Sequence, residues 1–127
     1  MKNIILFLLP FLLLSCDPRF DASYYIDNQT DSNVTIFFQS VLGTIDTSII
    51  SKDTKLLIFT EGALGQTSKK HLDNLKNLPF DSLRILNNQM KEYNKRTSDI
   101  ENWEKVYPSK EENFGKVILV VRPGDFD

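Results

Sequence analysis

The chain is poor in the side chains on which most catalytic and metal sites depend. Among its 127 residues it has one cysteine, Cys16, and one histidine, His71. A single cysteine closes no disulfide within the chain, so packing must hold the fold together. A Ser–His–Asp or Cys–His site would have to use His71, which lies in the polar stretch Lys69-Lys70-His71. We therefore expect no catalytic residue, no metal ion and no cofactor.

The chain also has few glycines and no excess of basic over acidic residues. The five glycines form no glycine-rich phosphate loop, and no acidic stretch has the spacing of an EF-hand. The 15 Lys and Arg are outnumbered by 17 Asp and Glu, which gives a net charge of −2. This weak acidity argues against a nucleic-acid partner.

The apolar run at the amino end is too short for a transmembrane helix. Residues 4–14 form a run of eleven residues, whereas a helix that crosses a bilayer needs about 20. The run follows the basic start Met1-Lys2-Asn3 and is closed by the small residue Ser15. This order of charge, apolar run and small residue is typical of a secretion signal that is later removed.

The tetrapeptide Leu13-Leu14-Ser15-Cys16 resembles the lipobox of bacterial lipoproteins. The resemblance implies cleavage before Cys16, a diacylglyceryl thioether on its sulfur and usually a further acyl chain, such as palmitate, on its amino group. Two lipid attachments suffice for stable anchoring. We expect an exported protein that is lipid-anchored to the bacterial cell membrane or the outer membrane. Asp17 favours the inner membrane in some Gram-negative bacteria, and the choice stays open.

The chain divides into a signal peptide at 1–15, a lipidated tether at 16–22 and one domain at 23–127. Cleavage leaves 112 residues, enough for a single domain with a proper core. It removes one cation, Lys2, and so leaves 14 Lys and Arg against 17 Asp and Glu, a net charge of −3.

The first two β-rich runs predict a hairpin. Tyr24-Tyr25-Ile26 and residues 34–38 flank a polar turn cluster at 29–33. Pairing Asn28 with Val34 gathers five apolar side chains on one core face: Tyr24, Ile26, Val34, Ile36 and Phe38. Tyr25 then falls opposite Phe37 on the other face. This aromatic pair is either covered by another element or exposed to a partner, and it is the best candidate for a contact patch.

The remaining pattern predicts further strands and two short helices. Strands are expected at 46–50, 56–60, 82–86 and 117–121, the last covered on both faces because every residue is apolar. Residues 61–65 predict a turn, and a loop at 87–89 could set Arg84 against Glu92 in a strand at 90–93. Helices are expected at 98–107, where a capping-box pattern begins, and more weakly at 70–78. The first of these could cover Phe37.

The predicted fold is mainly β: an antiparallel β-sandwich with one or two short helical connections. An open sheet backed by helices is the alternative. Three further segments resemble small uncharacterised bacterial lipoproteins: residues 24–30, residues 80–85 and the terminal strand ending in Gly124-Asp125-Phe126. That resemblance implies an immunoglobulin-like or transthyretin-like sandwich and carries no activity.

Three functions remain open at this point. The leading hypothesis is a non-enzymatic lipoprotein that binds an envelope protein or glycan or supports an assembly, in an unknown oligomeric state. A carbohydrate-binding module would need a flat exposed platform of aromatic rings, drawn from Tyr25, Phe37, Tyr93, Trp103 and Tyr107. A small hydrolase would need two carboxyl groups across a cleft, and the candidate pairs are Glu111 with Glu112, Asp99 with Glu101, and Asp125 with Asp127.

Overall fold

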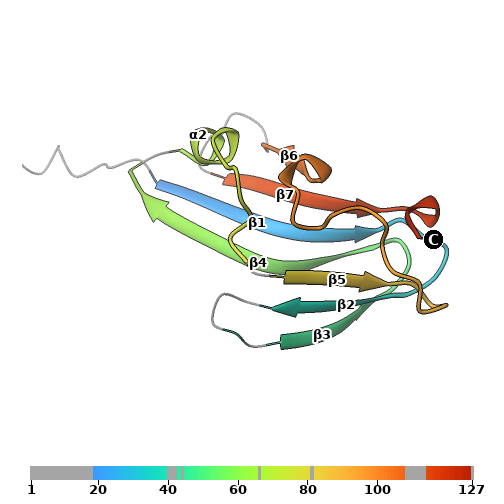
Figure 1. Cartoon of the computed structure of the whole chain (residues 1–127). Coiled ribbons are helices and arrows are strands. Elements are labelled where there is room, and N and C mark those ends of the chain that lie inside the picture. Colours follow the sequence, from blue (N-terminus) through green and yellow to red (C-terminus); the bar gives the residue numbers. More distant parts are fainter. Residues whose placement is uncertain are drawn as a thin grey trace, which may run out of the picture.

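The chain folds into two β-sheets that face each other (Figure 1). The computed structural model describes residues 19–39, 43, 45–65, 67–80, 82–107 and 114–126. One sheet has four strands and the other has three. The predicted mainly-β sandwich is therefore confirmed.

The four-stranded sheet, sheet A, is built around the first strand. β1 (Arg19–Asn28) lies between β4 (Thr54–Leu64) and β7 (Phe114–Val121), and β6 (Glu104–Val106) extends the far edge of β7. β1 runs antiparallel to β4 and parallel to β7, so one pair departs from the expected antiparallel pattern. Residues 117–121 are all buried, as their continuous apolar run predicted.

The three-stranded sheet, sheet B, is antiparallel throughout. β2 (Val34–Gln39) lies between β3 (Ile45–Ile50) and β5 (Ser82–Leu86). The strands predicted at 46–50, 56–60 and 82–86 are present. The turn predicted at 61–65 is wrong, because Glu61, Gly62, Ala63 and Leu64 continue β4 along β1. β4 ends at Leu64, and Gly65 follows it with a φ of +105°, which lies in the left-handed region that favours glycine.

The predicted hairpin is also wrong, although its core face is right. β1 and β2 belong to different sheets, so their apolar side chains meet across the sandwich rather than side by side. Alternating side chains look the same in sequence whether two strands are neighbours or face each other. All five predicted core residues are buried: Tyr24, Ile26, Val34, Ile36 and Phe38.

The folded domain begins before residue 23, the predicted start, and therefore closer to Cys16. β1 begins at Arg19, and Phe20 and Ala22 are buried in the core. Two residues, Asp17 and Pro18, therefore separate Cys16 from the first strand in the sequence. The tether predicted at 16–22 is too long.

The helix predicted at 98–107 is reduced to one 3-10 turn, η2 (Ile100–Asn102). Asp99 caps it by accepting a hydrogen bond from the backbone N–H of Glu101. The chain then extends, because the Trp103 ring enters the core between Tyr24 and Phe80 and β6 pairs with β7. The Trp103 indole N–H donates to the carbonyl of Thr97 at 2.9 Å, which satisfies its buried donor.

The helix predicted at 70–78 is shorter and begins earlier, as α2 (Ser68–Asp73). Thr67 caps it, and Leu72 is fully buried against β7. A Cβ atom on Gly115 would lie 2.5 Å from Cδ1 of Leu72, so any larger residue there would force the buried Leu72 side chain to shift.

The side chain of Asn28 joins the two sheets at the end opposite α2. Its amide nitrogen donates to the carbonyls of Ser32 at 2.8 Å and Ile50 at 2.9 Å. Its amide oxygen accepts from the backbone N–H and the hydroxyl of Thr30. One fully buried amide thus ties β1 to the β1–β2 connection and to the end of β3.

Replacing this amide should destabilise the whole domain. Asn28→Ala removes four hydrogen bonds made by a fully buried side chain, so the free energy of unfolding should fall by roughly 2–3 kcal/mol. Urea denaturation measures the change. Asn88→Ala is the matched control, because Asn88 is exposed and should alter stability by less than about 0.5 kcal/mol. Equal effects of the two substitutions would contradict the assigned role.

Candidate functional site

Tyr25 and Phe37, the predicted contact pair, lie on opposite outer faces of the sandwich. Tyr25 faces outward from sheet A and Phe37 from sheet B, so they form no common patch and the predicted pairing is wrong. Both side chains are half-buried. A cation from a neighbouring strand lies over each ring: Lys116 Nζ at 5.9 Å from the Tyr25 centroid, and the Arg84 guanidinium at 5.8 Å from that of Phe37.

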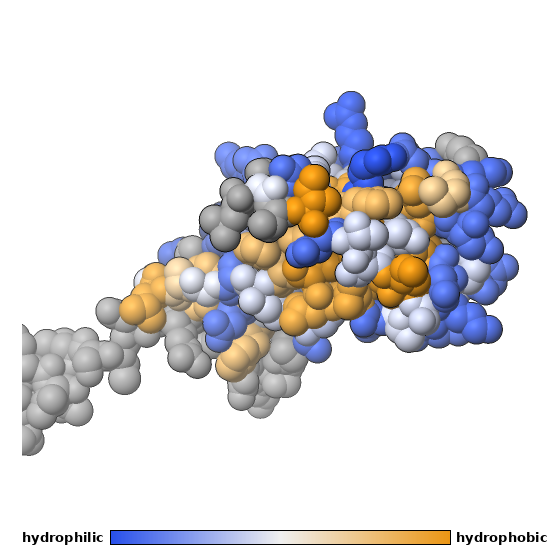
Figure 2. Space-filling model, turned by 90° about the horizontal axis from the view of Figure 1, so that it is seen from below, coloured by the Kyte–Doolittle hydropathy of each residue, from blue (hydrophilic) through white to orange (hydrophobic). Residues whose placement is uncertain are grey.

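The surface beside Phe37 is apolar and open. Ile45 and Ile49 of β3 are each 67% exposed and share the outer face of sheet B with Phe37. Figure 2, seen from below in Figure 1, shows apolar residues gathered along the middle of this side, with hydrophilic residues around them. A hollow of about 200 Å³ lies among Phe37, Ile45 and Arg84. Phe37 therefore remains available for contact, whereas the predicted helical cover over it is absent from the described residues.

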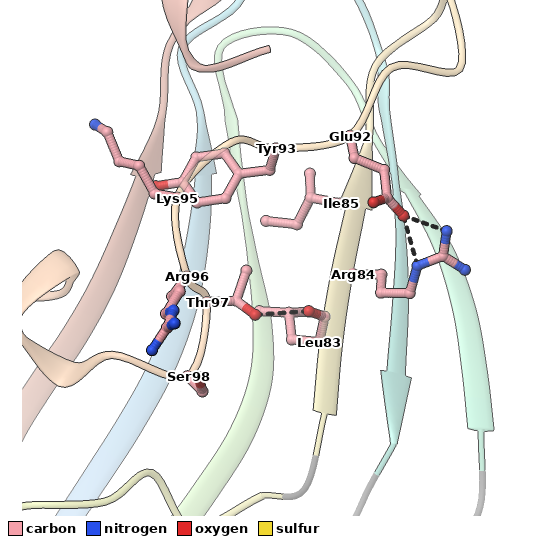
Figure 3. A pocket seen from close by; sticks show the side chains of 9 residues that line it. All are labelled: Leu83, Arg84, Ile85, Glu92, Tyr93, Lys95, Arg96, Thr97 and Ser98. Atoms are coloured by element: carbon pink, nitrogen blue, oxygen red, sulfur yellow. Dashed lines mark hydrogen bonds and ion pairs between the residues drawn. The ribbon is translucent and has the colours of Figure 1, made fainter. Parts of the chain in front are cut away.

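A larger hollow, the β5 cleft, lies between β5 and the segment 92–98 (Figure 3). The segment is attached to β5 at two points: the Tyr93 N–H donates to the Ile85 carbonyl at 2.9 Å, and the Thr97 hydroxyl donates to the Leu83 carbonyl at 2.7 Å. Between these points it turns away, because the Asn94 N–H donates to the carbonyl of Asp125. The separation leaves a cleft of about 480 Å³.

Unused backbone donors lie along the floor of the β5 cleft. In a strand the N–H and the C=O of one residue point to the same side, so the N–H groups of Leu83 and Ile85 face the segment 92–98. The segment accepts no backbone hydrogen bond from either N–H. A ligand that offers an oxygen acceptor can bind at this edge, as an added strand does.

The charged groups around the β5 cleft are partly paired. Arg84 forms an ion pair with Glu92, and Lys95 lies 3.0 Å from a carboxylate oxygen of Asp125. Arg96 is exposed, and although its backbone carbonyl accepts from Asp99 and Asn102, its guanidinium makes no ion pair with the described part of the chain. Burial and the charge of Asp125 raise the pKa of Tyr93 to about 12, so this ring adds no negative charge near neutral pH. The cleft therefore suits a small anion such as a carboxylate.

Sequence reasoning missed the β5 cleft. The side chains of Arg84 and Glu92 form an ion pair, but Glu92 lies opposite Leu86 rather than Arg84, and the strand predicted at 90–93 is reduced to isolated bridges from Glu92 and Tyr93. The basic residues that follow, Lys95 and Arg96, were the available signal. However, the sequence around Lys95 and Arg96 contains no pattern that predicts the separation of the segment 92–98 from β5.

His71 belongs to a half-buried cluster rather than to a solvated stretch. Glu61 Oε1 accepts from the Tyr24 hydroxyl at 2.6 Å and lies 2.8 Å from His71 Nε2. The Phe20 ring stacks on the imidazole with centroids 4.0 Å apart. Burial, together with the Glu61 carboxylate, raises the pKa of Tyr24 far above its usual value. The cluster joins α2 to β1 and β4.

The cluster has the wrong partners for nucleophilic catalysis. The nearest serine on α2, Ser68, is buried, and its hydroxyl is hydrogen-bonded to the N–H and the carbonyl of Asp21. Nucleophilic catalysis by serine needs its hydroxyl free to pass a proton to a base. His71 is therefore assigned a packing role.

The predicted carboxylate pairs do not line a common cleft in the described structure. Asp99 and Glu101 are exposed at η2. Asp125 is buried in η3 (Pro123–Asp125), where it accepts from the Arg122 N–H at 2.8 Å. Glu111, Glu112 and Asp127 lie outside the described residues. Across the described ranges, no group of three or more His, Cys, Asp and Glu side chains is placed to hold a metal ion.

The five aromatic side chains named for sugar binding form no shared platform. Trp103 and Tyr93 are buried, and Tyr107 is half-buried and donates to Asp73 at 2.8 Å. Tyr25 and Phe37 point out from opposite faces. The arrangement gives no support to a stacking surface for sugars.

Comparisons with protein-family models, with curated proteins and with solved structures found no match to this chain. Within the ranges that the structure describes, no helix is long and apolar enough to cross a bilayer.

The β5 cleft should bind small carboxylates weakly, through the N–H groups of Leu83 and Ile85 and the guanidinium of Arg96. Titration with acetate, followed by NMR, should shift the amide signals of Leu83 and Ile85. Arg96→Ala should weaken the apparent affinity about tenfold, whereas Lys52→Ala, which removes an exposed lysine outside the cleft, should leave it unchanged. Shifts of equal size throughout the protein would contradict a defined site.

Alkaline pH should destabilise the domain through its buried tyrosines. Tyrosine in the unfolded chain ionises near pH 10.0, whereas folding raises the pKa of Tyr24 and of Tyr93. Above pH 10.0 the unfolded state loses protons first, so the free energy of unfolding falls as the pH rises. Tyr24→Phe removes one such group and should make that fall shallower by about 1.4 kcal/mol per pH unit. Urea titrations at several alkaline pH values test this, and an unchanged slope would count against it.

Proposed function

We propose that this chain is a lipid-anchored protein of the bacterial cell envelope, attached through acyl chains on Cys16, whose β-sandwich binds another envelope molecule and catalyses no reaction. One observation carries the proposal. The basic start, the apolar run at 4–14 and the lipobox-like Leu13-Leu14-Ser15-Cys16 end three residues before the first strand of the core.

The fold is compatible with removal of the amino-terminal segment. Cleavage before Cys16 would leave all of β1 in place, including the buried Phe20 and Ala22. The mature domain would keep its core while the new amino end carries the lipid. Each buried CH₂ of an acyl chain contributes about 0.8 kcal/mol, so two or more chains hold a small domain at a membrane.

A binding role is supported by the β5 cleft. It offers backbone N–H donors beside the exposed cation of Arg96, and its one lining carboxylate, Glu92, is paired with Arg84. Such a set recognises an acidic group of a protein or of a glycan. Hydrolysis by acid–base chemistry would require a second carboxyl group facing the first across the cleft.

Removing the cysteine tests the anchor. Cys16→Ala should move the protein from the membrane fraction to the soluble fraction, or leave an uncleaved precursor, without lowering the denaturation midpoint of the domain. Ser15→Ala keeps a small residue before the cleavage point and should still be processed and anchored.

Mass spectrometry of the membrane-bound protein supplies the second measurement. The mature chain should begin at Cys16 and carry the added mass of acyl chains. A free thiol at Cys16, or a Cys16→Ala variant that is still cleaved and membrane-bound, would overturn the proposal.

A further inference from the structure

Two exposed apolar side chains flank the beginning of β1. Leu64, the last residue of β4, pairs with Arg19 and is 70% exposed. Phe114, the first residue of β7, pairs with Asp21 and is 42% exposed. Because Arg19 and Asp21 are two residues apart, Leu64 and Phe114 lie on the same outer face of sheet A. Figure 1 shows the beginnings of β1 and β7 and the end of β4 together at the α2 end of the molecule.

The chain between Cys16 and β1 is too short to let this end move far from the anchor. Three residue steps from Cys16 to Arg19 span at most about 11 Å when fully extended. Neighbouring strands lie about 4.8 Å apart, which puts the Leu64 backbone within roughly 16 Å of Cys16. Acyl chains on Cys16 would hold that residue at the lipid headgroups. The α2 end is then the end of the domain that meets the bilayer.

The same end carries exposed lysines. Lys69 and Lys70 of α2 are exposed, and Lys69 is paired with Asp73 at 2.6 Å. α2 is fixed to this end through Ser68, which bonds to the backbone of Asp21, and Leu72, which packs on Gly115. α2 packs on the inner face of sheet A, so its lysines and the pair Leu64 and Phe114 lie at the same end of the domain but on opposite faces of that sheet. Exposed lysine, leucine and phenylalanine at one end are side chains that suit the boundary between lipid headgroups and acyl chains.

We propose that the domain rests on the bilayer through its α2 end, with Leu64 and Phe114 entering the headgroup region and the strands standing away from the membrane. This inference rests on the proposed lipid anchor. It adds a second, weaker contact made by the folded domain, which fixes the orientation of the β5 cleft relative to the membrane.

A single introduced cysteine makes this orientation measurable. Acylated Cys16 has no free thiol, so a cysteine at position 64, 114 or 90 is the only site for a thiol-reactive, environment-sensitive fluorophore. Met90 is the matched control, because it is 72% exposed and lies in the turn after β5, at the opposite end. The lipidated full-length variants L64C, F114C and M90C are placed in phosphatidylcholine vesicles that contain lipids with a nitroxide at the headgroup.

Quenching should be several-fold stronger for the labels at positions 64 and 114 than for the label at position 90. Adding phosphatidylglycerol should increase the difference if Lys70 approaches the lipid. Equal quenching at all three positions in a protein that stays membrane-bound would overturn the orientation and leave the lipid anchor intact. Loss of the protein from the vesicles would overturn both.

Two controls separate the remaining explanations. In the first control, the fluorophore is attached at position 63 through A63C, with and without the double substitution L64S/F114S. The double substitution should leave the protein anchored through Cys16 but should weaken quenching of the label at position 63. Energy transfer between labels on different molecules that rises with protein density, without quenching by lipid, would mean that a second copy covers this end. That result would overturn the membrane contact.

Discussion

The buried amide of Asn28 is the interaction on which the arrangement of the two sheets depends. The chain passes between the sheets twice at one end of the sandwich, from β1 to β2 and from β3 to β4. Asn28 bonds to Ser32 in the first connection and to Ile50 at the end of β3, while its own carbonyl accepts from the N–H of Asp53 in the second. The core side chains of both sheets can face each other because these connections are held together. A hydrophobic core alone would not fix which strands are neighbours.

The strands and their inward-facing residues could be predicted well from the sequence, but the pairing of one strand with another could not. The two-residue alternation at 24–28 and 34–38 identified buried side chains correctly, because burial depends on which face a residue occupies. The neighbour of a strand depends on the whole chain, so the parallel pairing of β1 with β7 left no local pattern. The failed helix at 98–107 has the same cause. Its capping pattern was real, yet burial of Trp103 and pairing of β6 with β7 outweighed local helical preference.

The candidate site was less predictable than the fold, for a related reason. The β5 cleft exists because Tyr93 and Thr97 bond to β5 while the residues between them turn toward Asp125. Those contacts join residues 8 to 31 positions apart, and no spacing rule links them. By contrast, the lipobox-like tetrapeptide is a local signal, recognised in extended sequence, and therefore needs no fold to be recognised. The proposed lipid anchor is thus predicted from local sequence, whereas the proposed binding surface depends on the fold.

The position of β7 also has a consequence for the order in which the chain can fold. β1 is the first strand and β7 the last, and together they form the middle of sheet A. A chain delivered across a membrane from its amino end would present β1 long before β7 arrives. Closing so large a loop is entropically costly, and β1 would meanwhile lack one of its two neighbours. If the chain is exported as proposed, sheet A would therefore be completed only after the carboxyl end is released.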